Sequence, residues 1–162
     1  MRDDGHRWQA AQTAAAQGVT ITPVDLPEQR LISGIDVLAR YGADLIAWPD
    51  IAMGACYTLS LRRDRVLRVG DPTARLGYDA KTGLAGSDIA DGYMVYDIAG
   101  PGALACLKQG AELRLDQPSR SVLRQLFGID VMVYRTAAHG FRVHVPRPMA
   151  MAFLQHVAQP QT

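Results

Sequence analysis

The most constraining feature of the sequence is a pair of alternating apolar runs near its C-terminus. Residues 129–134 read IDVMVY, residues 141–145 read FRVHV, and a histidine-glycine pair at 139–140 lies between them. Alternation with a period of two buries one face of a strand, and a short polar turn joins two such strands antiparallel. Residues 147–158 follow with apolar residues on one helical side. This pattern predicts a β-hairpin with a C-terminal helix.

The segment before this hairpin adds a strand and a helix. Residues 93–98 favour a strand, and Gly-Pro-Gly at 100–102 turns the chain into a helix expected over residues 103–109. Residues 120–127 form a short amphipathic segment closed by Gly128. The order strand, helix, short segment, strand, strand, helix is typical of half a ferredoxin-like sandwich. We therefore expect an α+β fold in which helices cover one face of antiparallel sheets.

The N-terminal half contains weaker signals of the same kind. Residues 19–24 predict a strand, and residues 35–48 predict a helix that Pro49 ends. Two alternating runs around a charged turn at residues 62–65 predict a second hairpin. Residues 70–92 are rich in glycine and aspartate, which indicates either a functional loop or an element without a clear period.

These segments predict a single compact unit over residues 1–162. Within it we expect an N-terminal α/β lobe at residues 19–75 and a ferredoxin-like lobe at residues 88–158. Residues 1–17 are rich in alanine and glutamine and are expected to form a flexible arm or a loosely attached helix.

Composition excludes several classes of protein. The chain of 162 residues is 48% apolar and 20% charged, as is usual for a folded globular protein. Its formal net charge of +1 argues against a nucleic-acid binder, and no apolar run is long enough to span a membrane. Two aspartates interrupt the basic N-terminus, so we expect no secretion signal and a cytoplasmic protein. The histidines lack metal-ligand spacing, so no metal site is predicted.

No motif identifies a catalytic residue, but several side chains are candidates for binding. Asp88 and Asp91 could act in acid–base chemistry, or could form turns and helix caps. Arginines at positions 62, 63, 65 and 68 could form a docking surface for an acidic partner, or a solvated edge that deters strand pairing. Cys106 is expected to be a buried thiol, with a nucleophile as the alternative. The candidates for partner or ligand binding are Asp88, Asp91, Tyr93, Arg62, Arg65 and Arg147.

Residues 90–157 resemble the gamma subunit of heterotetrameric sarcosine oxidase. The matching features are an Asp-Gly pair before a strand, a Gly-Pro turn into a helix, a leucine-lysine step, a leucine-rich acidic run and a Val-Pro-Arg start of the last helix. They lie at Asp91-Gly92, Gly100-Pro101-Gly102-Ala103, Leu107-Lys108, Gly110, residues 113–116 and Val145-Pro146-Arg147.

The resemblance implies a fold like the folate-binding domain of aminomethyltransferase. It further implies a chain without a redox centre of its own, packed against larger flavin-bearing subunits of a heterotetramer. In such a complex the other subunits carry FAD, FMN and NAD, and tetrahydrofolate accepts the one-carbon unit released from sarcosine.

Three hypotheses about function follow. The first is a non-catalytic subunit of a complex that oxidatively demethylates sarcosine or a related N-methyl amino acid. The second is a free-standing protein of the aminomethyltransferase fold that binds folate or another small molecule between its lobes. The third is a small independent enzyme that uses Cys106.

Overall fold

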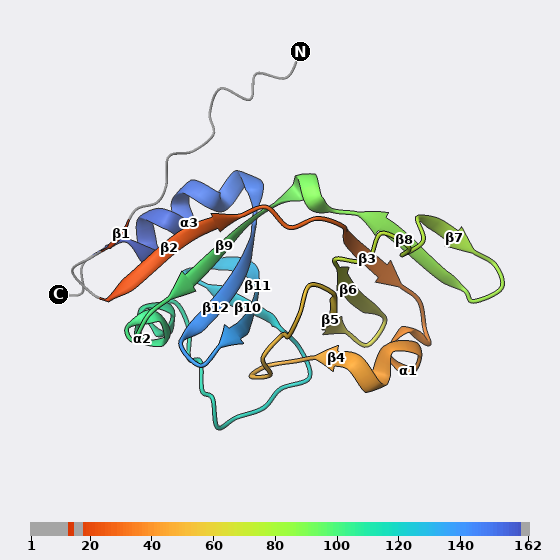
Figure 1. Ribbon diagram of the computed structural model, residues 1–162, viewed down its shortest axis with the longest axis horizontal. Coiled ribbons are helices and arrows are strands. Elements are labelled where there is room, and N and C mark those ends of the chain that lie inside the picture. The colour runs from red at the N-terminus through yellow and green to blue at the C-terminus, as the bar shows by residue number, and fades with distance from the viewer. Residues whose placement is uncertain (1–12, 15–17, 160–162) are drawn as a thin grey trace, which may run out of the picture.

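A computed structural model describes residues 13–14 and 18–159. Two six-stranded sheets form this described part of the molecule (Figure 1). The first sheet has the order β1-β2-β9-β12-β11-β10, and the second has the order β4-β5-β6-β3-β8-β7. All neighbouring strands are antiparallel except β4 and β5. The expected α+β class with largely antiparallel sheets is confirmed.

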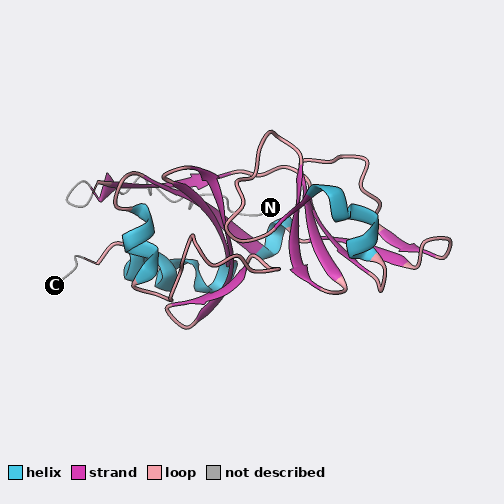
Figure 2. Cartoon of the chain, turned by 90° about the horizontal axis from the view of Figure 1, so that it is seen from below, coloured by secondary structure: helices cyan, strands magenta, loops and turns pink. Residues whose placement is uncertain are grey.

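The first sheet contains most of the C-terminal half. Its main strands are β9 (Tyr93–Ala99), β10 (Leu123–Leu126), β11 (Ile129–Ala137) and β12 (Gly140–Pro146). Helices α2 (Ala103–Lys108) and α3 (Ala150–Val157) cover its outer face, as Figure 2 shows. A 3-10 turn at Arg147–Met149 precedes α3. The predicted hairpin, both helices and the strand at residues 93–98 are confirmed.

The second sheet consists of β3 (Gln29–Ser33), β4 (Leu45–Ile46), β5 (Tyr57–Arg62), β6 (Arg65–Val69), β7 (Gly77–Asp79) and β8 (Leu84–Asp88). The hairpin predicted around residues 62–65 is confirmed as β5 and β6. The glycine-rich segment at 70–92 contains the hairpin of β7 and β8, followed by a 3-10 turn at Ala90–Gly92.

Two sequence-based expectations are wrong, and one that was left open is settled. The helix expected over residues 35–48 is limited to α1 (Val37–Tyr41), because a 3-10 turn at Gly42–Asp44 leads into β4, which pairs with β5. The amphipathic segment at 120–127, whose type the sequence left open, contains strand β10 (Leu123–Leu126), which pairs with β11. Strand β2 (Val19–Val24) is expected in the N-terminal lobe, yet it pairs with β9 in the first sheet.

The arm expected at residues 1–17 lies outside the described residues, except for β1 (Thr13–Ala14). These two residues pair with Thr20 and Val19. Within the described part of the chain, no helix has the length and apolar composition needed to cross a bilayer.

Three apolar clusters hold the layers together. The first cluster packs α2 and α3 against the first sheet and includes Phe153 and Phe141. A third, smaller cluster packs α1 against the second sheet. The second cluster lies between the two sheets and contains Leu59, Leu67 and Tyr134. Because burial of apolar surface is the dominant favourable term in folding, this middle cluster joins the sheets into one unit.

Candidate functional site

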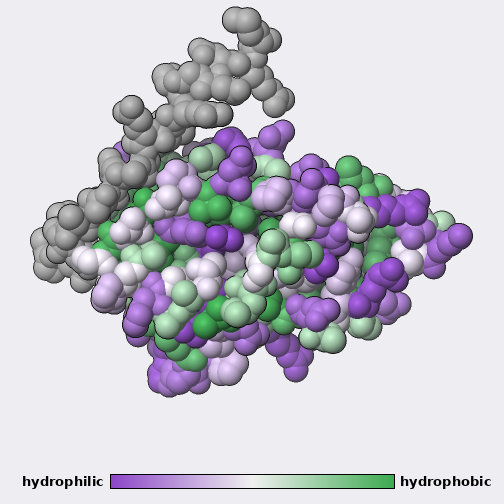
Figure 3. Space-filling view, in the orientation of Figure 1, coloured by the Kyte–Doolittle hydropathy of each residue, from purple (hydrophilic) through white to green (hydrophobic). Residues whose placement is uncertain are grey.

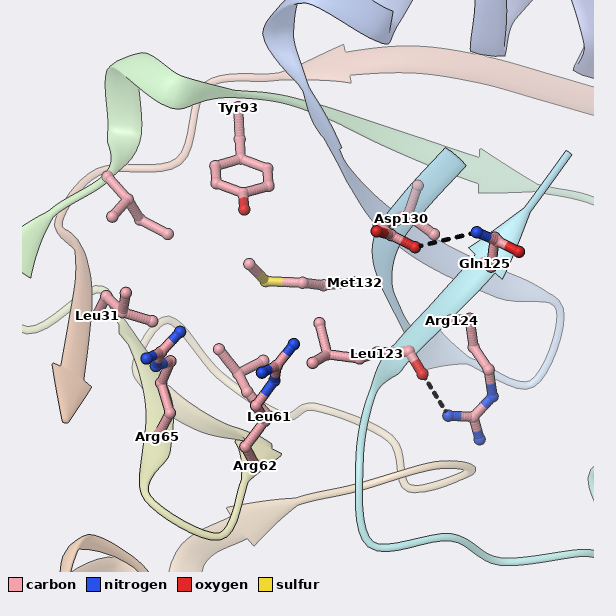
Figure 4. Close-up of a pocket in the computed structure, with 12 residues that line it drawn as sticks. Leu31, Leu61, Arg62, Arg65, Tyr93, Leu123, Arg124, Gln125, Asp130 and Met132 are labelled. Atoms are coloured by element: carbon pink, nitrogen blue, oxygen red, sulfur yellow. Dashed lines mark hydrogen bonds between the residues drawn. The ribbon is translucent and has the colours of Figure 1, made fainter. Parts of the chain in front are cut away.

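A cavity of about 440 Å³ opens beside the cluster between the two sheets. Its size is in the range of pockets that bind small molecules. Strands from both sheets and the crossing from β8 to β9 contribute its walls (Figure 4). The lining residues are Leu31, Leu61, Arg62, Arg65, Ile89, Tyr93, Leu123, Arg124, Gln125, Asp130, Val131 and Met132.

Strand register places Arg65 at this cavity. On β6, Leu67 and Val69 face the first sheet and belong to the cluster between the sheets. Side chains two residues apart in a strand share a face. Arg65 therefore lies on the face of β6 that is directed toward the other sheet. The next two residues on that face, Leu67 and Val69, are apolar and buried.

A β-bulge brings Arg62 to the same place. Ser60 pairs with Val66, but the next pair is Arg62 with Arg65, so β5 contains one extra residue, Leu61. A bulge interrupts strict alternation and re-aims a side chain. Arg62 thus lies beside Leu61 and opposite Arg65, and Figure 4 shows both guanidinium groups at the cavity.

These two arginines lack counter-charges in the described part of the chain. No hydrogen bond or ion pair is formed by either side chain with another described residue, and Nε of Arg65 is buried without an acceptor. Like charges directly opposite each other on neighbouring strands are destabilising. The cavity therefore has one strongly cationic wall.

The remaining walls are mostly apolar. Leu31, Ile89, Leu123 and Met132 line them, and the ring of half-buried Tyr93 points its hydroxyl group into the space in Figure 4. At the rim, Gln125 donates a hydrogen bond to the exposed carboxylate of Asp130 over 3.4 Å.

Arg124 also borders the cavity but is directed elsewhere. Its guanidinium group donates to the carbonyl oxygens of Ser121 and Leu123 and to Oγ of Ser119, over 3.0, 2.7 and 2.7 Å respectively. It also lies 5.9 Å from the ring centre of Trp48. Partial burial lowers the pKa of Arg124, as expected for a cation removed from water.

The acidic candidates lie at the crossing from β8 to β9 and do not line the cavity. Asp88 accepts a hydrogen bond from the amide of Ala90, which together with the Arg30 ion pair holds its pKa below the ordinary value, against an opposing effect of burial. An ionised carboxylate that caps a turn fits the turn-forming interpretation of this residue. The main-chain oxygen of Asp91 accepts a hydrogen bond from Arg147.

Arg147 fastens this crossing to the first sheet. Its Nε donates to the carbonyl oxygen of Asp91 over 2.7 Å, and its terminal nitrogens lie 3.4 Å from the carbonyl oxygen of Tyr93 and 3.1 Å from Sδ of Met94. Of the predicted candidates, the structure thus brings Arg62, Arg65 and Tyr93 together at the cavity. Asp88 and Asp91 lie instead at the adjacent crossing from β8 to β9. We call this crossing, together with Arg147 that binds it to the first sheet, the strap.

Two members of the arginine cluster lie away from a sheet edge. Strand β6, which carries Arg65 and Arg68, lies between β5 and β3 inside the second sheet, whereas Arg62 is exposed on β5 beyond its short pairing with β4. Arg68, the fourth member, is neutralised by Asp71 at 3.1 Å and also donates to Thr58. Arg62 and Arg65 at the cavity, by contrast, have no counter-ion among the described residues.

Sequence reasoning missed a buried polar chain between the sheets. The Tyr134 hydroxyl lies 2.7 Å from that of Tyr57 and 2.8 Å from Nε2 of His144. Arg142 donates to the Tyr57 hydroxyl and makes a two-pronged ion pair with Asp97. Histidine and arginine two residues apart on β12 were the available signal, since both fall on the strand face opposite the buried valines.

Burial governs the ionisation of this chain. His144 is fully buried, and desolvation together with the nearby Arg142 charge lowers its pKa to about 3. The ion pair with Asp97 raises the pKa of Arg142 despite its partial burial. His144 is therefore neutral and Arg142 charged at neutral pH.

In the described part of the chain, Cys106 is not placed to act as a nucleophile, and no side-chain cluster is placed to bind a metal ion. Cys106 is 2% exposed, and burial raises the pKa of its thiol, the opposite of what activates a nucleophile. Among residues 13–14 and 18–159, no group of three or more histidine, cysteine, aspartate or glutamate side chains is placed to hold a metal ion.

Comparison with known proteins finds likeness in structure alone. No family model and no curated protein matches the sequence. A chain of the heterotetrameric sarcosine oxidase from Corynebacterium sp. U-96, solved with pyrrole 2-carboxylate, is similar with a TM-score of 0.64 and 18% identity. The match covers 90% of this chain and 89% of the other, so the two share one fold over nearly their whole length.

A second solved structure is similar over a smaller share of its length. It is the glycine cleavage system aminomethyltransferase T from Bartonella henselae, with a TM-score of 0.46 and 12% identity. The match covers 86% of this chain and 45% of the other.

Proposed function

We propose that this chain is a non-catalytic, gamma-type subunit of a sarcosine-oxidase-like heterotetrameric flavoenzyme. Such a complex would oxidatively demethylate sarcosine or a related N-methyl amino acid. The observation that carries the proposal is the fold match to a chain of a heterotetrameric sarcosine oxidase, which extends over nearly all of both chains. Other subunits of the complex would carry FAD, FMN and NAD.

The residues behind the family resemblance have structural roles that support this proposal. Gly100 adopts a φ of +121°, and a Cβ there would overlap the carbonyl oxygen of Gly18. Arg147 straps the crossing between the sheets. These features maintain the fold itself, as expected where a small chain contributes shape to an assembly instead of chemistry.

The hairpin of β7 and β8 offers a surface for a partner subunit. It extends beyond the rest of the second sheet, at the right of Figure 1, and β7 is an edge strand. Tyr78 is 67% exposed and Leu76 is 54% exposed. Figure 3 shows apolar surface among charged side chains at this end of the molecule. Exposed apolar side chains on an unpaired edge are typical of a protein contact.

Affinity purification of the tagged full chain from its native lysate tests the proposal. We expect larger chains to co-purify with a flavin absorption band. A double variant, Leu76→Ser with Tyr78→Ser, should lose these partners, because it removes apolar area from the hairpin. Met151→Ser is the matched control, since Met151 is exposed on α3. A chain that purifies alone and colourless would contradict the proposal and favour the small-molecule-binding alternative.

A further inference from the structure

We infer that the cavity at Arg62 and Arg65 binds a small organic carboxylate with an apolar body. The inference concerns the described residues of this chain and does not depend on assembly into a complex. Three features carry it: the paired cations, the buried Nε of Arg65, and the apolar walls.

The paired cations are the first feature. Arg62 and Arg65 are direct cross-strand partners, and no described residue neutralises either of them. By contrast, Arg30 on β3, Arg68 on β6 and Arg142 on β12 each have an aspartate partner. Arg62 is exposed and Arg65 is partly buried, so water screens their repulsion in part, and an anion between them would offset the remainder.

The second feature is the buried nitrogen of Arg65. Buried polar groups in native proteins nearly always have a hydrogen-bond partner, and an exception needs an explanation. Nε of Arg65 has none among the described residues, as is also true of Nε in Arg30 and Arg135. The terminal nitrogens of Arg30 and Arg135 are hydrogen-bonded, however, whereas Arg65 makes no side-chain hydrogen bond with a described residue. Arginine presents parallel N–H groups that match the two oxygens of a carboxylate, so a bound carboxylate would supply the acceptor.

The apolar walls define the rest of the ligand. Leu31, Leu123 and Met132 line the same cavity of about 440 Å³ as the two arginines. Tyr93 adds a hydroxyl group that can donate to a second oxygen. An inorganic anion would leave the apolar walls in contact with water, whereas a carboxylate attached to a hydrocarbon body would satisfy both sides.

Binding of octanoate by the purified full chain, measured by titration calorimetry, tests this inference. Octanamide is the matched probe, because it has the same hydrocarbon chain without the charge. We expect octanoate to bind about tenfold or more tightly than octanamide, as charge-assisted hydrogen bonds imply. Equal binding of the two probes, or no binding of octanoate at millimolar concentration, would overturn the inference.

Variants locate the site. Arg65→Gln and Arg62→Gln should each weaken octanoate binding about tenfold or more. Arg63→Gln is the control, because Arg63 lies in the same turn but does not line the cavity. An equal loss with Arg63→Gln would mean that general surface charge attracts the anion, which would contradict a built site.

Stability separates a binding role from a structural one. If Arg65 serves the fold, Arg65→Gln lowers the denaturation midpoint of the unliganded chain. If it serves a ligand, the same variant leaves that midpoint unchanged or raises it, because a facing like charge is removed. A lowered midpoint with unchanged octanoate affinity would overturn the inference.

Discussion

The hydroxyl oxygens of Tyr57 and Tyr134 lie 2.7 Å apart, and each comes from a different sheet. Arg142 can only donate, so the Tyr57 oxygen accepts its bond, and the Tyr134 hydroxyl is also hydrogen-bonded to Nε2 of His144. This buried polar chain therefore ties the two sheets together inside an otherwise apolar cluster.

Replacing Tyr134 with phenylalanine should destabilise the chain. The variant leaves Nε2 of fully buried His144 without its partner, which costs about 1–3 kcal/mol. Urea denaturation followed by tryptophan fluorescence measures the change. Tyr78→Phe is the control, because that ring is 67% exposed and should change stability by less than about 0.5 kcal/mol. Equal midpoints for the two variants would refute the role assigned to the chain.

The stability of the protein should depend on pH through His144. Between its ordinary pKa of 6.5 and its folded value of about 3, the unfolded chain binds a proton at this residue and the folded chain does not. The free energy of unfolding therefore falls as pH falls through this window, by at most about 1.4 kcal/mol per pH unit from this group.

Urea denaturation of the wild type and of His144→Gln at several pH values checks this slope. Asp71, Asp79, Asp88 and Asp116 also have lowered pKa values, but their contribution is lost only as pH falls below about 5. The window from about pH 5 to 6.5 thus separates the histidine from these carboxylates. His144→Gln should be flatter there, and a slope identical to that of the wild type would show that His144 is not its source.

Arg147→Met should loosen the crossing between the sheets. The methionine keeps an aliphatic stem but loses the bonds to the carbonyl oxygens of Asp91 and Tyr93, at a cost of about 1 kcal/mol. Hydrogen exchange should accelerate at residues 89–94 before it does elsewhere. Arg120→Met is the control, since Arg120 is exposed. Unchanged exchange in Arg147→Met would indicate that this arginine serves a partner instead of the strap.

Gly100→Ala should be strongly destabilising. Gly100 has a φ of +121°, and its missing Cβ leaves room for the carbonyl oxygen of Gly18. Backbone strain of this kind costs about 1–3 kcal/mol before the steric overlap is added. Gly92→Ala is the control, because nothing lies within 4 Å of a Cβ there. Thermal denaturation of both variants measures the difference, and a similar midpoint for the two would contradict the close approach.

Local sequence patterns correctly predicted the elements in which the spacing of apolar residues matches the face that is buried. The hairpin of β11 and β12 alternates because one face packs under the helices and the other faces the second sheet. Strand β4 has only two residues and arises from pairing with β5, so no local period could reveal it. The first sheet likewise recruits β2 from the other end of the chain, a partnership set by tertiary contact.

The candidate site was predicted only in part, for a similar reason. Arg62 and Arg65 stood out as a basic turn, but their convergence depends on the extra residue in β5. Sequence alternation assigns neighbouring residues to opposite faces, and a bulge changes this without a distinctive residue type. Tyr93, the first residue of β9, lines the same cavity as residues of both sheets, which is a property of the assembled sheets.

The central claim is that this chain is a subunit of a flavoenzyme complex. Its most direct test is the visible absorption spectrum of material purified through the tagged full chain, recorded anaerobically before and after addition of sarcosine. The account predicts a flavin band that co-purifies with larger chains and bleaches when sarcosine reduces the flavin. A colourless 17.6 kDa species without partners would contradict it.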